Sequence, residues 1–286
     1  RWKMAKTKLP AEINLFDLVV SVSSEIGQNY PVNYLETLGV SKLRQVLKML
    51  LTVSNVDLSP ECCDEVEKLL NSELLSYNIV SANTLPVLSR CLTTNLCLWR
   101  GDITTLKVDA IVNAANSALL GCFSPNHPCI DNAIHCAAGP RLRAACREIM
   151  NHHAITGTQN NHGEPTGRAQ ITSGYCLPST YVLHTVGPIY DGESETMEGS
   201  YMANQLASCY ESCLELASRH GALSIAFCCI STGVFGYPND SAAKTAMTTV
   251  INWLSNPNNH NKIDQVVFNV FTDTDLDLYQ NMFNSL

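Results

Sequence analysis

Short apolar runs alternate with helical stretches along the chain from Leu96 onward. The runs are LCLW, DAIVNAA, RAQITSGY, YVLHTV, ALSIAFCCI and DQVVFNVF. Helical spacing fills the stretches between them, at residues 140–150, 201–220 and 240–254. Strands that alternate with helices of this length predict a mixed or parallel sheet between helical layers. In such sheets, ligands bind beyond the carboxyl ends of the strands.

The first ninety residues show a different pattern, that of one-sided helices. Apolar residues recur at spacings of three and four over residues 11–26 and 41–53, and a proline marks the start of a third helix over residues 60–70. The length of 286 residues also suggests two units. We therefore predict an all-helical N-terminal cap over residues 1–92 and an α/β domain over residues 93–286.

Charge, hydropathy and cysteine usage exclude several classes of protein. The net charge is −8 and no block of Lys or Arg occurs, so attraction to a nucleic-acid backbone is unfavourable and we expect no nucleic-acid partner. No apolar run approaches the ~18 residues that a membrane span requires. The 13 cysteines lie largely within apolar patterns of a chain too large to need disulfides, so we expect reduced thiols and a cytoplasmic protein. The segment 151–167 is predicted to be an exposed insertion without a function.

Three polar segments directly follow predicted strands. They are GDIT (residues 101–104), NAAN (residues 113–116) and STGVFGYP (residues 231–238). In the third segment, Gly233 and Gly236 allow backbone N–H groups to turn toward a phosphate near the start of the following helix. Such a loop binds a diphosphate without Lys or Arg, so the acidic net charge is no obstacle.

The segment GCFSPNHPCIDNAIH (residues 121–135) carries a concentration of metal-binding side chains. Cys122, His127 and Cys129 form a C-x4-H-x-C spacing of ligands that suit zinc, and two prolines limit the freedom of the loop. Three local ligands leave one tetrahedral position open, which is typical of a catalytic zinc. The alternative is three unrelated reduced side chains. His135 and Cys136 are interpreted as packing residues of the next helix, with contact to the site as the lesser alternative.

The ordered motifs GDIT, DAIVNAAN, AIHCAAG, TSGY with VLHTVGP, and ISTGVFGYP resemble those of the macrodomain, over about residues 96–286. The macrodomain is an ADP-ribose-binding module, and the resemblance implies a three-layer α/β/α sandwich with a mixed sheet. In the commoner hydrolase macrodomains a polyglycine loop ending in VDGAIH follows NAAN. Its replacement here resembles the zinc-dependent class, whose members remove ADP-ribose from proteins and often carry a helical N-terminal extension. This class implies one Zn²⁺ per chain, held by Cys122, His127 and Cys129.

The resemblance also implies which residues bind ADP-ribose. Asp102 accepts from the adenine amine and Ile103 contacts the ring. Phe271 is a candidate to lie against adenine, with an ordinary core phenylalanine as the alternative. The diphosphate loop comprises Ser231, Thr232, Gly233, Val234, Phe235 and Gly236, and Phe235 packs on the distal ribose.

Two residues beside the metal segment are the catalytic candidates that the resemblance implies. Asn116 reaches the hydroxyls of the distal ribose, whereas Asn113 braces the two loops. Asp131 falls where the polyglycine-type hydrolases carry their acidic residue. Its alternative role is that of an aspartate that stabilises a helix N-terminus through the helix dipole.

The predicted function is zinc-dependent hydrolysis of mono-ADP-ribose from modified protein side chains. An Asp or Glu ester at the distal ribose C1 is the expected linkage because it is the most labile. Zinc either positions the ribose or activates water, and we favour a mixed role. The alternatives are a reader that does not cleave, a deacylase of free O-acyl-ADP-ribose, and an inactive scaffold with a structural zinc. Members of the class resemble partners of a sirtuin-type transferase that modifies a lipoyl-carrier protein, which makes such a protein a candidate substrate.

Overall fold

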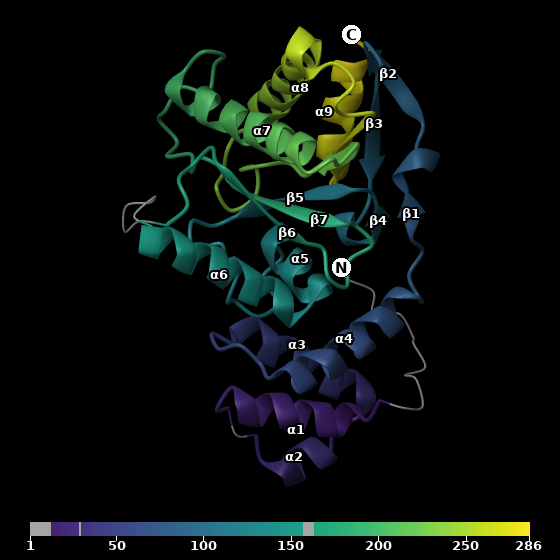
Figure 1. The fold of residues 1–286 in the computed structure, drawn as a ribbon, viewed down its shortest axis with the longest axis vertical. Coiled ribbons are helices and arrows are strands. Elements are labelled where there is room, and N and C mark those ends of the chain that lie inside the picture. The colour runs from purple at the N-terminus through teal and green to yellow at the C-terminus, as the bar shows by residue number, and fades with distance from the viewer. Residues whose placement is uncertain (1–12, 29, 157–162) are drawn as a thin grey trace.

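A seven-stranded mixed sheet forms the centre of the α/β part in the computed structural model, which describes residues 13–28, 30–156 and 163–286 (Figure 1). Its strand order is β2-β3-β9-β8-β5-β7-β6. The inner strands are parallel, and they are β3 (Thr94–Arg100), β9 (Gln265–Val270), β8 (Ser224–Phe227), β5 (Ala110–Ala115) and β7 (Tyr181–Val186). The edge strands β2 (Val87–Cys91) and β6 (Ala169–Ser173) are antiparallel to their neighbours. A separate parallel pair joins β1 (Val80–Ser81) to β4 (Leu106–Lys107).

Helices cover both faces of this sheet. On one face lie α5 (Ile130–Ala138) and α6 (Pro140–Thr156), and on the other lie α7 (Tyr201–Arg219), α8 (Asn239–Ser255) and α9 (Asp273–Phe283) (Figure 1). Three short 3-10 helices are η1 (Ala82–Thr84), η2 (Ile103–Thr105) and η3 (Pro257–Asn259). Every residue of the inner strand β9 is buried, as expected for a strand covered on both faces. The predicted three-layer α/β/α arrangement with a mixed sheet is confirmed.

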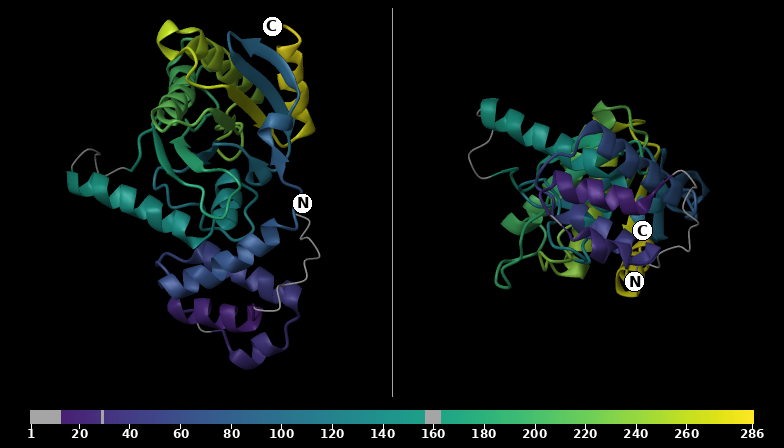
Figure 2. Two further views of the ribbon diagram at one scale, coloured as in Figure 1. Left: turned by 45° about the vertical axis from the view of Figure 1, so that its right-hand side comes forward. Right: turned by 90° about the horizontal axis from the view of Figure 1, so that it is seen from below.

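The N-terminal helices form a second body below the layer of α5 and α6 (Figures 1 and 2). They are α1 (Leu15–Glu25), α2 (Val32–Glu36), α3 (Val40–Val53) and α4 (Pro60–Leu74). In α3 the buried leucines Leu43, Leu47 and Leu50 follow the helical spacing that the sequence shows. Helix α4 begins where predicted, because the Ser59 side chain accepts from the amide of Cys62 and Pro60 occupies the first turn.

The predicted domain boundary between residues 92 and 93 lies in the turn that joins β2 to β3. Strand β2 therefore belongs to the sheet of the α/β part, and the helical bundle ends with α4. Residues 11 and 12 of the first predicted helix, and residues 157–162 of the predicted insertion, lie outside the described residues.

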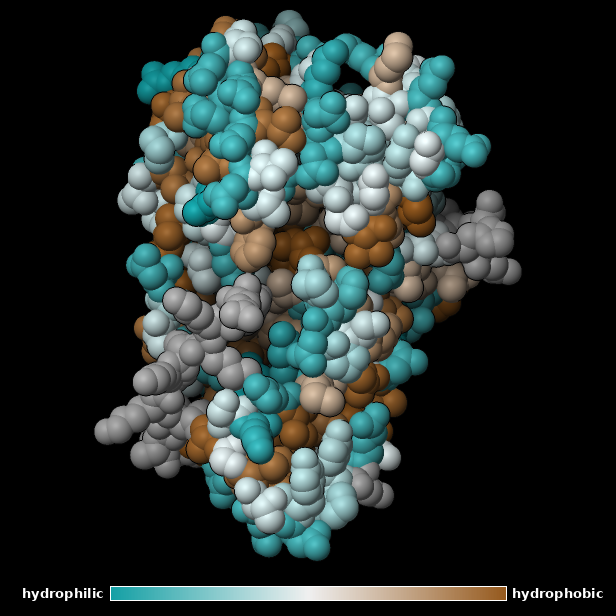
Figure 3. All heavy atoms as spheres, turned by 180° about the vertical axis from the view of Figure 1, so that it is seen from behind, coloured by the Kyte–Doolittle hydropathy of each residue, from teal (hydrophilic) through white to brown (hydrophobic). Residues whose placement is uncertain are grey.

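Polar side chains cover much of the surface, and apolar ones gather in a hollow near the middle of the face opposite Figure 1 (Figure 3). Among the described residues, no helix is both long and apolar enough to cross a membrane.

Candidate active site

The carboxyl ends of the parallel strands bring the predicted site segments to one edge of the sheet. Asp102 follows β3, Asn116 follows β5, residues 231–236 follow β8, and Phe271 follows β9. These four strands run parallel within one sheet, so their carboxyl ends lie at the same edge. This is the edge where ligands bind in open α/β sheets.

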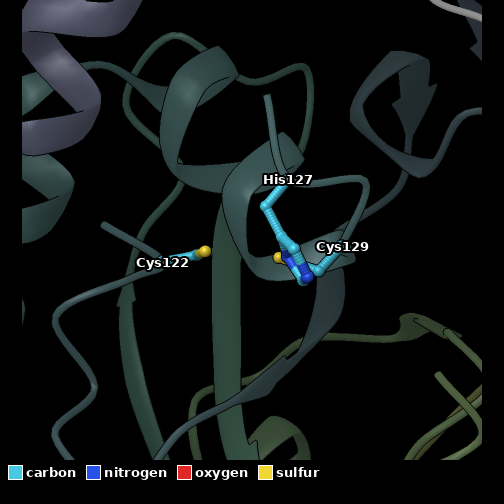
Figure 4. A group of neighbouring side chains, drawn as sticks. All are labelled: Cys122, His127 and Cys129. Carbon is cyan, nitrogen blue, oxygen red and sulfur yellow. The ribbon is translucent and has the colours of Figure 1, made fainter. Parts of the chain in front are cut away.

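The loop from β5 to α5 brings the three predicted metal ligands together. The Sγ atoms of Cys122 and Cys129 and a ring nitrogen of His127 all lie within 4.8 Å of one another, and the three side chains point toward a common point (Figure 4). Nδ1 of His127 is buried and has no hydrogen-bond partner among the described residues. Two thiols and an imidazole with an unused nitrogen fit a zinc ion. We call residues 121–129 the metal loop.

Cys129 also begins helix α5, which limits its movement. Its Sγ accepts from the amide of Asn132 at 3.4 Å as the N-cap of the helix. Burial, and to a lesser extent the neighbouring Cys122 thiol, raise the pKa of the Cys129 thiol to about 11, although the hydrogen bond from the Asn132 amide lowers it. A metal that binds here must therefore displace a proton.

Hydrogen bonds from two asparagines hold the metal loop in place. Asn116 Nδ2 donates to the carbonyl of Gly121 at 3.0 Å, and Asn132 Nδ2 donates to the carbonyls of Ser124 at 3.0 Å and His127 at 3.3 Å. Gly121 has φ +83°, and a Cβ there would lie 2.9 Å from the ring of His135. Only glycine fits this turn, so the loop begins close against α5.

A buried network fixes Asp131 next to the metal loop. Asn113 Nδ2 donates to Asp131 Oδ1 at 2.8 Å and to His184 Nδ1 at 3.2 Å, and Asn113 is paired in register with His184 across β5 and β7. His184 therefore carries its proton on Nε2, which lies 2.9 Å from Thr172 Oγ1. Asn116 Nδ2 approaches the other carboxylate oxygen of Asp131 at 3.5 Å. Asn113 thus braces the carboxylate, and Asn116 lies between the carboxylate and the metal loop.

Burial dominates the electrostatics of this network. Asp131 is 5% exposed, and burial raises its pKa to about 6 against the lowering effects of the Asn113 bond and the Arg143 charge. Burial also lowers the pKa of His184 to about 4, so that this ring is neutral. His184 is not among the site residues predicted from sequence. A histidine within the apolar strand VLHTVGP was the one signal of its buried, hydrogen-bonded role.

His135 lies against the same carboxylate. Its Nε2 is 3.5 Å from Asp131 Oδ1, and neither ring nitrogen has a hydrogen-bond partner among the described residues. One of its ring nitrogens also lies within 4.8 Å of Cys146 Sγ and of a ring nitrogen of His184. That second group offers no complete metal site, because Nδ1 of His184 accepts from Asn113 and Nε2 carries the proton. His135 therefore contacts the site as well as packing in the helix.

The predicted diphosphate loop has the backbone geometry of an anion site. Ser231 and Gly236 both have φ +67°, and a Cβ added at Gly233 or Gly236 would meet no atom within 4 Å. The amides of residues 233–235 donate to no acceptor in the part of the chain that the structure describes. Consecutive free amides beside open space can bind an anion. The carbonyl of Phe235 accepts from the amide of Tyr190 at 2.8 Å, which anchors the loop.

The predicted adenine contacts differ in exposure. Asp102 caps η2 and accepts from the amide of Thr104 at 3.0 Å and from its Oγ1 at 2.7 Å. Phe271 is 67% exposed at the end of β9, so the alternative of a core phenylalanine is wrong. Ile103 is 1% exposed and packs in the main core, so contact with an adenine ring requires its neighbours to shift.

Comparisons with known proteins identify the family of this chain. Residues 112–246 match the Macro domain family. A protein-ADP-ribose hydrolase from Staphylococcus aureus strain MSSA476 is 51% identical over 191 residues, which are 66% of this chain and 66% of that protein. One from Treponema medium is 51% identical over 187 residues, 65% of this chain and 66% of that protein. The matched segment thus spans about 66% of the length of these curated relatives.

Solved macrodomain structures are also similar to this chain. The Oceanobacillus iheyensis macrodomain with ADP is 37% identical with a TM-score of 0.59, and the match covers 69% of this chain and 94% of that one. A Trypanosoma brucei macrodomain in complex with ADP-ribose is 32% identical with a TM-score of 0.60, and the match covers 82% of this chain and 94% of that one. The chain therefore belongs to the macrodomain family.

Proposed function

We propose that this protein is a zinc-dependent hydrolase that removes mono-ADP-ribose from modified protein side chains. The observation that carries the proposal is the convergence of Cys122, His127 and Cys129 on a loop whose neighbours are Asn116 and Asp131. The names of the S. aureus and T. medium relatives and the ADP-ribose in the T. brucei structure support it.

ADP-ribose would lie along the carboxyl edge of the sheet. Phe271 offers an exposed ring for adenine, and Asp102 offers a carboxylate oxygen for its amine. The free amides of residues 233–235 would bind the diphosphate. The distal ribose would then lie toward Asn116 and the metal loop.

The reacting bond joins the distal ribose C1 to the modified side chain. Zinc, when bound, supplies a Lewis acid that holds a hydroxyl or water and lowers the pKa of that water. Asn116 would orient the ribose, and Asp131 would accept a proton from water. Asn113 and His184 keep the Asp131 carboxylate in one orientation. An Asp or Glu ester is the linkage we propose, because its leaving group needs least help, and a lipoyl-carrier protein is the proposed substrate.

The test measures zinc content and ADP-ribose release together. The purified chain is assayed on a carboxyl-modified protein before chelation, after chelation and after zinc is restored. Cys129→Ala is compared with Cys91→Ala, a cysteine of the edge strand β2 outside the site. We expect about one zinc per chain, and loss of release with chelation or Cys129→Ala while Cys91→Ala stays active.

Other outcomes would select the alternatives. Release that persists without zinc would make the metal loop structural and Asp131 the principal catalytic residue. Binding of ADP-ribose without release in any state would indicate a reader. Faster turnover of free O-acyl-ADP-ribose than of the protein conjugate would indicate a deacylase of the free metabolite.

A further inference from the structure

One arginine of α6 contacts both the cap and the metal site. Arg143 Nε donates to the carbonyl of Leu120 at 2.8 Å, and its guanidinium carbon lies 4.7 Å from the centre of the Phe123 ring. Its Nη1 donates to the carbonyls of Leu51 at 2.8 Å and Ser54 at 2.7 Å. Arg143 is 9% exposed, so one buried cation joins two distant segments.

The cap carbonyls that it contacts are a good receptor for a cation. Leu51 lies in the last turn of α3 and Ser54 is its C-cap residue. The last carbonyl groups of a helix lack partners within the helix and carry the negative end of its dipole. The end of α3 therefore satisfies the guanidinium and fixes its position.

Two other arginines of the same helix contact the cap alone. Arg141 pairs with Asp64 and Glu67, and Arg147 pairs with Asp57. Among the described residues, neither side chain forms a hydrogen bond or ion pair with residues 119–129. The chain therefore contains two natural controls for Arg143.

We propose that Arg143 is a positioning residue through which the docked cap holds the metal loop in its metal-binding shape. The inference rests on the proposed metal site. Leu120 and Phe123 flank Gly121 and Cys122, so a guanidinium fixed by α3 restrains the backbone before the first ligand and the side-chain ring that follows it. The other two ligands are already held by Asn132 and by the start of α5. Without Arg143, the bond from Asn116 to Gly121 would be the remaining restraint beside Cys122, so more of this end of the loop would have to be ordered when the metal binds, which weakens affinity.

Zinc affinity of the full chain tests the inference. Affinity is measured by competition with a chromophoric chelator under reducing conditions for wild type, Arg143→Lys, Arg141→Lys and Arg147→Lys. Lysine keeps the charge but cannot donate to Leu120 and the cap in the fork geometry of arginine. We expect zinc binding about tenfold weaker in Arg143→Lys and within about twofold of wild type in both controls, since one to two charge-assisted hydrogen bonds are lost.

Phe123→Leu provides a second variant in which folding is not at risk, because Phe123 is 37% exposed. Loss of its contact with the guanidinium should weaken zinc binding about two- to fivefold. The inference is overturned if Arg143→Lys binds zinc as wild type does, or if either control loses as much affinity. A wild type that binds no zinc would overturn the proposed function as well.

Hydrogen exchange supplies the readout on the cap side. Coupling between two sites is reciprocal, so a cap that aids zinc binding must itself be stabilised by zinc. We expect zinc to slow amide exchange over the last turn of α3 in wild type and to have no such effect in Arg143→Lys. Exchange in α3 that does not respond to zinc in wild type would show that the cap takes no part.

Discussion

Replacing Gly187 with alanine should weaken ADP-ribose binding through the neighbouring diphosphate loop. A Cβ at Gly187 would lie 2.0 Å from Ser231 Oγ and 2.9 Å from Ile230 Cγ2, whereas real Cβ contacts are essentially never under 3.0 Å. Rotation of the serine relieves only the first contact, so the backbone at Ser231 must move. Overpacking of this kind costs about 1–3 kcal/mol, or about 5- to 150-fold in a dissociation constant if the loop absorbs it.

Calorimetric titration with ADP-ribose, beside thermal unfolding, checks this prediction. The double variant Gly187→Ala/Ser231→Gly should recover part of the affinity, because it removes the contact with the hydroxyl while the contact with Ile230 remains, and glycine tolerates the φ of +67° at position 231. Gly39→Ala is the control, because its Cβ would meet no atom within 4 Å. Unchanged affinity in Gly187→Ala, or no recovery in the double variant, would refute the reasoning.

Phe271→Ala should weaken ADP-ribose binding by about 1–2 kcal/mol in the same titration, with the melting temperature unchanged because the ring is 67% exposed; equal affinity would place adenine elsewhere. Burial lowers the pKa of His184 to about 4 in the folded protein, below the value of about 6.5 in the unfolded chain. As the pH falls between these values, the unfolded chain takes up a proton that the folded protein does not, so the free energy of unfolding decreases. Denaturant unfolding between pH 7 and 4 should therefore show wild type losing about 3 kcal/mol more than His184→Gln, and parallel curves would contradict this. Leu47→Ala in the cap, where the side chain is fully buried, should lower the free energy of unfolding by about 2–5 kcal/mol, and a loss under 1 kcal/mol would show that the cap core repacks.

The inner strands and long helices could be predicted from sequence because burial imposes a pattern on them. Strand β9 is apolar at most positions since both its faces are covered. Strand β2, by contrast, is largely exposed at the sheet edge, and its residues VLSRC lack the alternation that identifies a strand. Helix α2 has only five residues and a single buried position, so its sequence carries too little periodicity. Helix α9 also lacks a sequence-based prediction, because one of its three buried positions is the polar Asp275, which leaves Tyr279 and Phe283 as its buried apolar residues.

The site could be predicted where its residues are neighbours in sequence. Cys122, His127 and Cys129 lie within one loop, so their spacing together with the flanking macrodomain-like motifs predicts convergence. The contact of Asn113 with His184 spans 71 positions and depends on strand register. The contact of Arg143 with Ser54 spans 89 positions and depends on how the cap packs. Neither register nor packing orientation can be derived from local pattern.

The cap and the arginines of α6 that contact it are far apart in sequence, which sets the order in which they are synthesised. The buried core of the cap lies within residues 15–70, apart from Cys176. Arg143 and Arg147 follow their cap partners by 89 and 90 positions, so they leave the ribosome about 5–20 s later at usual elongation rates. Because nearly all of these buried side chains come from the cap's own helices, the apolar contacts of the cap are available before the arginines of α6 are made. We therefore expect the cap to collapse first and the α/β part to pack against it afterwards.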